Sequence, residues 1–265
     1  MDSTDRGAAG TAATPDGAEL AWSVHGDRGP AILLLPGQAT THRSWLHVVP
    51  QLAAGHRVVV MDHRGIGQST LGRAPEVGTR GFAADAVEVL DAAGVEAAHL
   101  YGHSMGGRVA QWMAVDAPER VASLTLVGST PGDSRGPARA PEVSRALAGE
   151  DLEAMGPLFF TEDFLAAHPD VARDFFARDA SVRARRVHYQ ASTGHDAWEV
   201  LPRIDAPTLV VHGAADPVNL PEHGRLLAER IRGAELLELD GQRHCPHLES
   251  ADCTAAVLAF VDGLC

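Results

Sequence analysis

The sequence predicts an α/β protein built on a mostly parallel β-sheet that is flanked by helices on both faces. Two observations support this class. Short apolar runs alternate with helix-like stretches along most of the chain, which is typical of βαβ units. The chain also has 265 residues, of which 45% are hydrophobic, enough for one sizeable core with an insertion.

The predicted elements follow in chain order. Residues 1–14 are rich in Ala, Gly, Thr and Asp and are predicted to be disordered. Residues 18–24 are expected to open the sheet as an edge strand or hairpin. The remaining predicted strands are the apolar runs at 31–35, 57–61, 97–101, 121–127, 207–211 and 235–239.

The alternation stops between residues 133 and 198, where helical stretches follow one another without a strand signal. We therefore predict that residues 15–132 and 199–265 form the α/β core and that residues 133–198 form a helical insertion. Five of the seven phenylalanines lie in this insertion, and adjacent pairs among them must point to different helix faces. They are Phe159, Phe160, Phe164, Phe175 and Phe176.

Composition limits the partners. The formal charge of −13 disfavours nucleic acid and anionic membranes, and no apolar run approaches the roughly 20 residues of a membrane helix. No secretory leader is evident at the N-terminus. The three cysteines are odd in number, which fits a reducing compartment better than a disulfide framework. We expect a cytoplasmic protein whose partner is a small molecule; its oligomeric state is left open.

Residues 102–106 read Gly-His-Ser-Met-Gly and lie between an apolar run and a helix-like run. A serine hydroxyl becomes a good nucleophile only when it is held exposed beside a base. A sharp strand-to-helix turn provides that exposure, and its crowding excludes side chains two residues before and after the serine. Gly102 and Gly106 occupy those positions, so Ser104 is the predicted nucleophile.

The predicted acid is Asp216, which follows the apolar run at 207–211 in a loop where open α/β sheets place their chemistry. An isolated Asp more often caps a helix, but Asn219 lies nearer to the next helix start and is the expected cap. Asp133, after the preceding strand, is the alternative acid.

The predicted base is His244, which follows the run at 235–239 and a short turn. His247 lies at the start of the next helix and is less free to reach a serine. His244, Cys245 and His247 also suggest zinc, but a histidine that follows a strand is better explained as the base, and no metal site is predicted. Two backbone N–H groups should bind the oxyanion, those of Gln38 and Met105.

These motifs resemble the α/β-hydrolase fold family, in its serine-nucleophile, cap-bearing form, over nearly the whole chain from about Gly17. In this family the cap is inserted after the sixth strand, and the loop at 62–69 is structural. Arg243 departs from the family pattern, which often has glycine before the base. The matching segments are Leu35-Pro36-Gly37, residues 62–69, residues 102–106, Gly213 to Asp216, and His244-Cys245-Pro246 with Glu249.

The resemblance and the motifs predict a serine hydrolase that cleaves an ester or lactone of a largely apolar small molecule through an acyl-enzyme, without a cofactor. The five phenylalanines of the insertion are the predicted substrate-binding residues. The alternatives are a thioesterase, a cofactor-free haloperoxidase or perhydrolase, and a non-hydrolytic receptor or cyclase that retains the triad.

Overall fold

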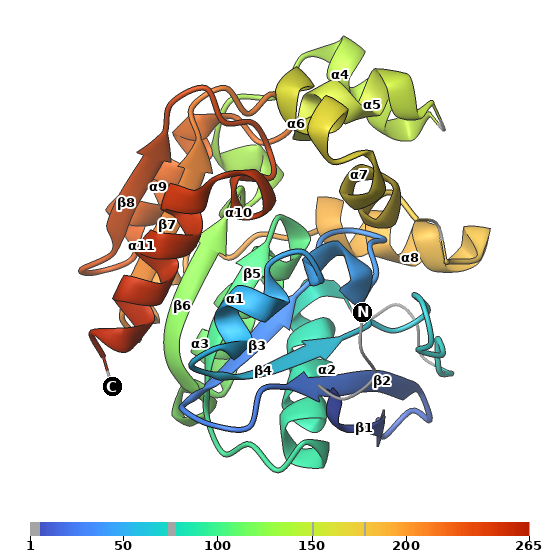
Figure 1. Cartoon of the computed structure of the whole chain (residues 1–265), viewed down its shortest axis with the longest axis vertical. Coiled ribbons are helices and arrows are strands. Elements are labelled where there is room, and N and C mark those ends of the chain that lie inside the picture. The colour runs from blue at the N-terminus through green and yellow to red at the C-terminus, as the bar shows by residue number, and fades with distance from the viewer. Residues whose placement is uncertain (1–5, 74–77, 150, 178, 265) are drawn as a thin grey trace.

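The protein folds around one twisted, mostly parallel sheet, which confirms the predicted fold class (Figure 1). The computed structural model describes residues 6–73, 78–149, 151–177 and 179–264. Within them the strand order is β1-β2-β4-β3-β5-β6-β7-β8. Strand β2 pairs antiparallel with both β1 and β4, and every other neighbouring pair is parallel. The strands are β1 Arg6–Ala13, β2 Glu19–His25, β3 Ala31–Leu35, β4 Arg57–Met61, β5 Ala98–His103, β6 Val121–Val127, β7 Thr208–Gly213 and β8 Glu235–Leu239.

Helices cover both faces of the sheet, and across the described ranges none is long and apolar enough to cross a membrane. The α-helices are α1 Val49–Ala53, α2 Gly78–Ala92, α3 Met105–Asp116, α4 Pro141–Ala148, α5 Leu152–Phe159, α6 Glu162–Ala167, α7 Pro169–Phe175, α8 Val182–Thr193, α9 Pro221–Arg230, α10 Pro246–Glu249 and α11 Ala251–Asp262. Short 3₁₀ turns occur at η1 His42–Trp45, η2 Pro118–Arg120, η3 Asp133–Arg135 and η4 Leu201–Arg203.

Alternate residues of the central strands supply two separate cores, because successive side chains of a strand point to opposite faces. Leu33 and Leu35 of β3 pack with Phe82 of α2 in one core, to which α3 and α9 also contribute. Ile32 and Leu34 pack with Trp45 in the other core, to which α1, α10 and α11 contribute.

The prediction that residues 1–14 are disordered is wrong for residues 6–14; residues 1–5 lie outside the described part of the chain. Residues 6–13 form β1, which pairs with β2 in an antiparallel hairpin. Small side chains do not prevent this pairing, because the ladder between β1 and β2 is made of backbone hydrogen bonds. A Cβ at Gly10 would lie 3.2 Å from the Trp22 ring, so the glycine leaves room for that indole.

Helices α4 to α8 lie between β6 and β7 in the chain and gather at one end of the sheet in Figure 1. They contribute to both cores. Val187 and Ala191 of α8 join the core around Phe82. Phe160 and Phe164 join the core around Trp45. The segment 133–198 therefore packs onto both faces of the α/β body.

Candidate active site

Ser104 occupies a strained turn between β5 and α3. Its φ and ψ are 53° and −115°, a backbone conformation that few non-glycine residues adopt. A Cβ at Gly102 would lie 2.5 Å from the Gly106 carbonyl oxygen, and one at Gly106 would lie 2.0 Å from the Leu35 carbonyl oxygen. Both glycines are therefore required by close backbone approach, and the second contact brings the end of β3 against the turn.

The end of β6 lies beside both Ser104 and His244. The Ser104 N–H donates to the Val127 carbonyl oxygen at 2.9 Å, and the Ser129 hydroxyl donates to the Ser104 carbonyl oxygen at 2.9 Å. Between them, Gly128 has φ 53°, and a Cβ there would lie 3.2 Å from Nδ1 of His244. The structure thus brings the predicted nucleophile and the predicted base to the same strand end.

His244 and Asp216 form a buried pair in which Nδ1 of His244 donates to Oδ2 of Asp216 at 2.7 Å. The other carboxylate oxygen accepts the N–H groups of Val218 at 2.8 Å and Asn219 at 3.0 Å. Burial raises the pKa of Asp216, but the charge of His244 and hydrogen bonds from His212 and His244 outweigh it and lower that pKa to about 2. The carboxylate is therefore ionised and orients the imidazole.

The structure separates the alternative acid from the base. Asp133 pairs instead with the buried guanidinium of Arg108, at 2.6 Å. The expectation that Asn219 caps the following helix is wrong, because Leu220 holds the cap position without a side-chain bond. The Asn219 amide instead donates to the Gly128 carbonyl oxygen at 2.7 Å, which ties the loop of Asp216 to the end of β6.

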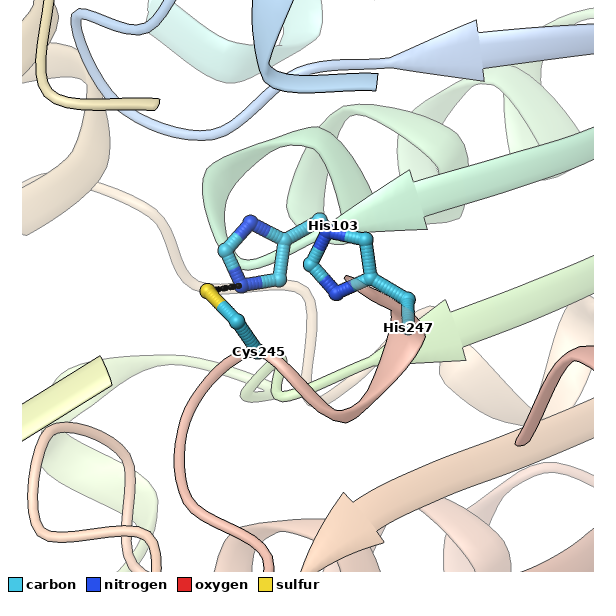
Figure 2. A group of neighbouring side chains, drawn as sticks. All are labelled: His103, Cys245 and His247. Atoms are coloured by element: carbon cyan, nitrogen blue, oxygen red, sulfur yellow. Dashed lines mark hydrogen bonds between the residues drawn. The ribbon is translucent and has the colours of Figure 1, made fainter. Parts of the chain in front are cut away.

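His103 supports the loop that carries His244, a role that sequence reasoning missed. Its Nε2 donates to the His244 carbonyl oxygen at 3.0 Å, and the two rings lie 4.8 Å apart. Figure 2 shows His103 beside Cys245 and His247. Burial and the neighbouring His247 and His244 lower the pKa of His103 well below its usual value, so the ring stays neutral. No sequence spacing could have revealed a contact to a backbone oxygen 141 positions away.

Among the described residues, His103, Cys245 and His247 are the one group of histidine, cysteine and acidic side chains placed to hold a metal ion, with ligand atoms within 4.8 Å of one another. The chemistry of the set disfavours it. Burial and the nearby Asp216 and Glu249 raise the pKa of the Cys245 thiol well above its usual value, whereas a metal ligand must be a thiolate. Nε2 of His103 is also engaged by a carbonyl oxygen.

The two predicted oxyanion donors lie in adjacent segments. Gln38 is exposed in the loop after β3, and Met105 is the buried first residue of α3. Within the described ranges, neither backbone N–H donates to another group of the protein. An unengaged N–H is what an oxyanion donor requires.

The five phenylalanines of the insertion do not share one position. The Phe159 ring lies 5.1 Å from the His244 ring, and the Phe175 ring lies 5.9 Å from the His103 ring. Phe160 and Phe164 stack at 5.1 Å and are buried in the core. Phe176 contacts Phe159 at 5.1 Å. Only Phe159 therefore touches the predicted base.

The insertion is also bonded to the loop of His244. The Arg243 guanidinium donates to the Pro157 carbonyl oxygen, and the Cys245 N–H donates to the Phe159 carbonyl oxygen at 3.0 Å. Glu249 accepts from the Thr161 N–H at 3.1 Å and from its hydroxyl. Arg243, which stands where the family often has glycine, thus connects the loop of the base to the end of α5.

Several buried histidines should make the stability of the fold sensitive to acid. Burial lowers the pKa of His188 to about 4. Burial also lowers the pKa values of His63, His195 and His247 to about 3, with smaller contributions from neighbouring His188, Arg108 and His244, respectively. Unfolded histidines bind protons below about pH 6.5, whereas these native ones do not, so stability falls as pH falls through that range. Each contributes up to about 1.4 kcal/mol per pH unit.

Denaturant unfolding between pH 8 and pH 4.5 should show this loss. The variant His63→Phe keeps a ring against Phe82 but cannot bind a proton. Its free energy of unfolding should therefore fall less steeply with decreasing pH than that of the parent protein. Equal slopes for the variant and the parent protein would contradict the assignment of His63.

The chain is similar to known proteins over most of its length. The family model described as alpha/beta hydrolase fold matches residues 30–251. RutD of Azorhizobium caulinodans, assigned provisionally as a carbamate hydrolase, is 34% identical over 240 residues, with 86% of this chain and 88% of that protein covered. The rhodomycin D methylesterase DauP of a Streptomyces species is 31% identical, with 86% and 89% covered.

Among solved structures, the enol-lactonase of Burkholderia xenovorans superposes with a TM-score of 0.81 at 26% identity, over 95% of this chain and 99% of that one. The similarities extend over nearly the full length of each protein.

Proposed function

The chain belongs to the alpha/beta hydrolase fold family, and from this premise we propose that it is a serine hydrolase that cleaves a carboxylic ester or lactone of a largely apolar small molecule. The observation that carries the proposal is the buried His244–Asp216 pair beside the strained turn of Ser104. The methylesterase and the enol-lactonase among the similar proteins support this bond class.

In the proposed mechanism Ser104 attacks the substrate carbonyl while Nε2 of His244 takes its proton. Nδ1 of His244 already donates to Asp216, so the tautomer leaves Nε2 free to accept. The N–H groups of Gln38 and Met105 stabilise the oxyanion. His244 then protonates the leaving alkoxide, and it activates the water that hydrolyses the acyl-enzyme.

Active-site labelling tests this proposal. A fluorophosphonate should add one phosphonyl group, which peptide mass spectrometry should place on Ser104, and the same protein should turn over a short p-nitrophenyl ester. Label without turnover would indicate a receptor or another non-hydrolytic member. If the protein showed no label and no turnover, the assignment of Ser104 as nucleophile would be refuted.

The aromatic residues near His244 support an apolar substrate, and we propose that the segment 133–198 caps the site. Helices α5, α6 and α7 also line an open pocket of about 380 Å³, whose walls include Pro157, Leu165 and Phe176. Phe176 contacts Phe159, which contacts His244, so two rings lie in a row between this pocket and the base.

Phe159→Ala should raise KM for aryl and octanoyl esters several-fold more than for acetyl esters. Each buried methylene contributes about 0.8 kcal/mol, so loss of an apolar wall affects large substrates most. Phe160 is the matched control: it is fully buried, and Phe160→Ala should instead cost about 3–5 kcal/mol of stability. Measurement of kcat/KM along an acyl series with both variants checks this. A KM ratio unchanged by Phe159→Ala would mean that its ring only packs the insertion.

A further inference from the structure

The loop that carries Gln38 contains a second strained residue. Ala39 has φ 57°, and among the described residues it and Ser104 are the two non-glycine residues with positive φ. Such a conformation is unfavourable for a residue with a Cβ and persists only where the surroundings hold it. Something outside the loop must therefore fix Ala39.

The group that holds Ala39 is His188, which lies on α8 in the segment 133–198. The Ala39 N–H donates to Nδ1 of His188 at 3.2 Å, and Nε2 of His188 donates to the Arg64 carbonyl oxygen at 3.0 Å. A carbonyl oxygen only accepts, so Nε2 carries the proton and Nδ1 is the acceptor. The ring is fully buried, with Phe82 at 5.0 Å and His63 at 6.1 Å, so its orientation is fixed by packing as well.

Hydrogen bonds from Thr40 and to His188 fix two consecutive peptide planes of this loop. The plane that contains the Gln38 N–H also contains the Gly37 carbonyl, which accepts from the Thr40 N–H at 3.4 Å and from the Thr40 hydroxyl at 3.1 Å. The next plane contains the Ala39 N–H, which His188 holds. With both planes held, the Gln38 N–H cannot rotate independently.

We propose that His188 is a positioning residue for the oxyanion loop: its neutral Nε2–H tautomer holds the Ala39 N–H and so keeps the Gln38 N–H directed at the developing oxyanion. This inference rests on the proposed function of Gln38. It also makes the oxyanion loop depend on α8, because the acceptor lies outside the α/β core.

Two isosteric variants separate the two bonds of His188. In His188→Asn the side-chain oxygen takes the place of Nδ1 and retains an acceptor for Ala39. In His188→Gln the amide nitrogen takes the place of Nε2 and retains only the donor to Arg64. Complete loss of an oxyanion donor costs about 10²–10³ in kcat, so misdirection in His188→Gln should cost about ten- to hundredfold, with KM nearly unchanged. His188→Asn should stay within a few-fold of the parent enzyme.

Hydrogen exchange of the Ala39 amide, measured by NMR, reports on its bond to His188 independently of enzymatic activity. It should be fast in His188→Gln and protected in the parent protein and in His188→Asn. The imidazole nitrogen shifts of His188 in the unmodified protein should show the Nε2–H tautomer, even if a variant fails to fold. An Nδ1–H tautomer, or equal kcat and equal Ala39 exchange in the two variants, would overturn the inference. A parent protein with a protected Ala39 amide but no ester turnover would instead refute the proposed function.

Discussion

Ser104→Ala is expected to lower kcat for a p-nitrophenyl ester by up to about a million-fold, because the three residues of a triad act as a unit. The fold should be retained. Ser104 is only partly buried, and the turn is set by Gly102, Gly106 and the bond from the Ser104 N–H to Val127. Steady-state kinetics on highly purified variant, with the melting temperature measured in parallel, check both statements.

The matched control is Ser129→Ala, which removes the hydroxyl that donates to the Ser104 carbonyl oxygen. It deletes a neighbouring serine hydroxyl but leaves the proposed nucleophile, so its loss should be smaller by orders of magnitude. If Ser104→Ala retained substantial turnover while Ser129→Ala did not, Ser104 would not be the nucleophile.

Asp216→Asn is expected to lower kcat by about 10⁴, because an amide nitrogen facing Nδ1 of His244 favours the wrong imidazole tautomer. Asparagine keeps one side-chain oxygen for the N–H groups of Val218 and Asn219, so the loop should retain its turn. The loss should therefore appear in kcat rather than in the melting temperature.

Asp133→Asn provides the comparison, since Asp133 was the other acid compatible with the sequence. Its carboxylate pairs with Arg108, and an asparagine oxygen can still accept from that guanidinium. We expect little change in kcat and at most a modest loss of stability. If Asp133→Asn lost most of its kcat while Asp216→Asn kept it, Asp133 rather than Asp216 would be the acid.

Local rules were sufficient for most of the strands and for the sharp turn at Ser104. The runs at 31–35, 57–61 and 121–127 match the bounds of β3, β4 and β6, because a strand buried on both faces is mostly apolar along its length. The spacing of Gly102 and Gly106 follows from backbone crowding within a few residues. The same rules failed for β1, which lacks large apolar residues but pairs with β2 through backbone hydrogen bonds.

The sequence by itself determined the α/β class, the nucleophile motif and a short set of candidate acids and bases, since each depends on periodicity or short-range sterics. Only the tertiary structure pairs Asp216 with His244 and Asp133 with Arg108, because loops that follow different strands converge in space. It alone also revealed the bonds from His103 to His244 and from Ala39 to His188. Each joins a side chain to a backbone group more than a hundred residues away, and backbone groups are the same at every position, so no residue pattern records such a contact.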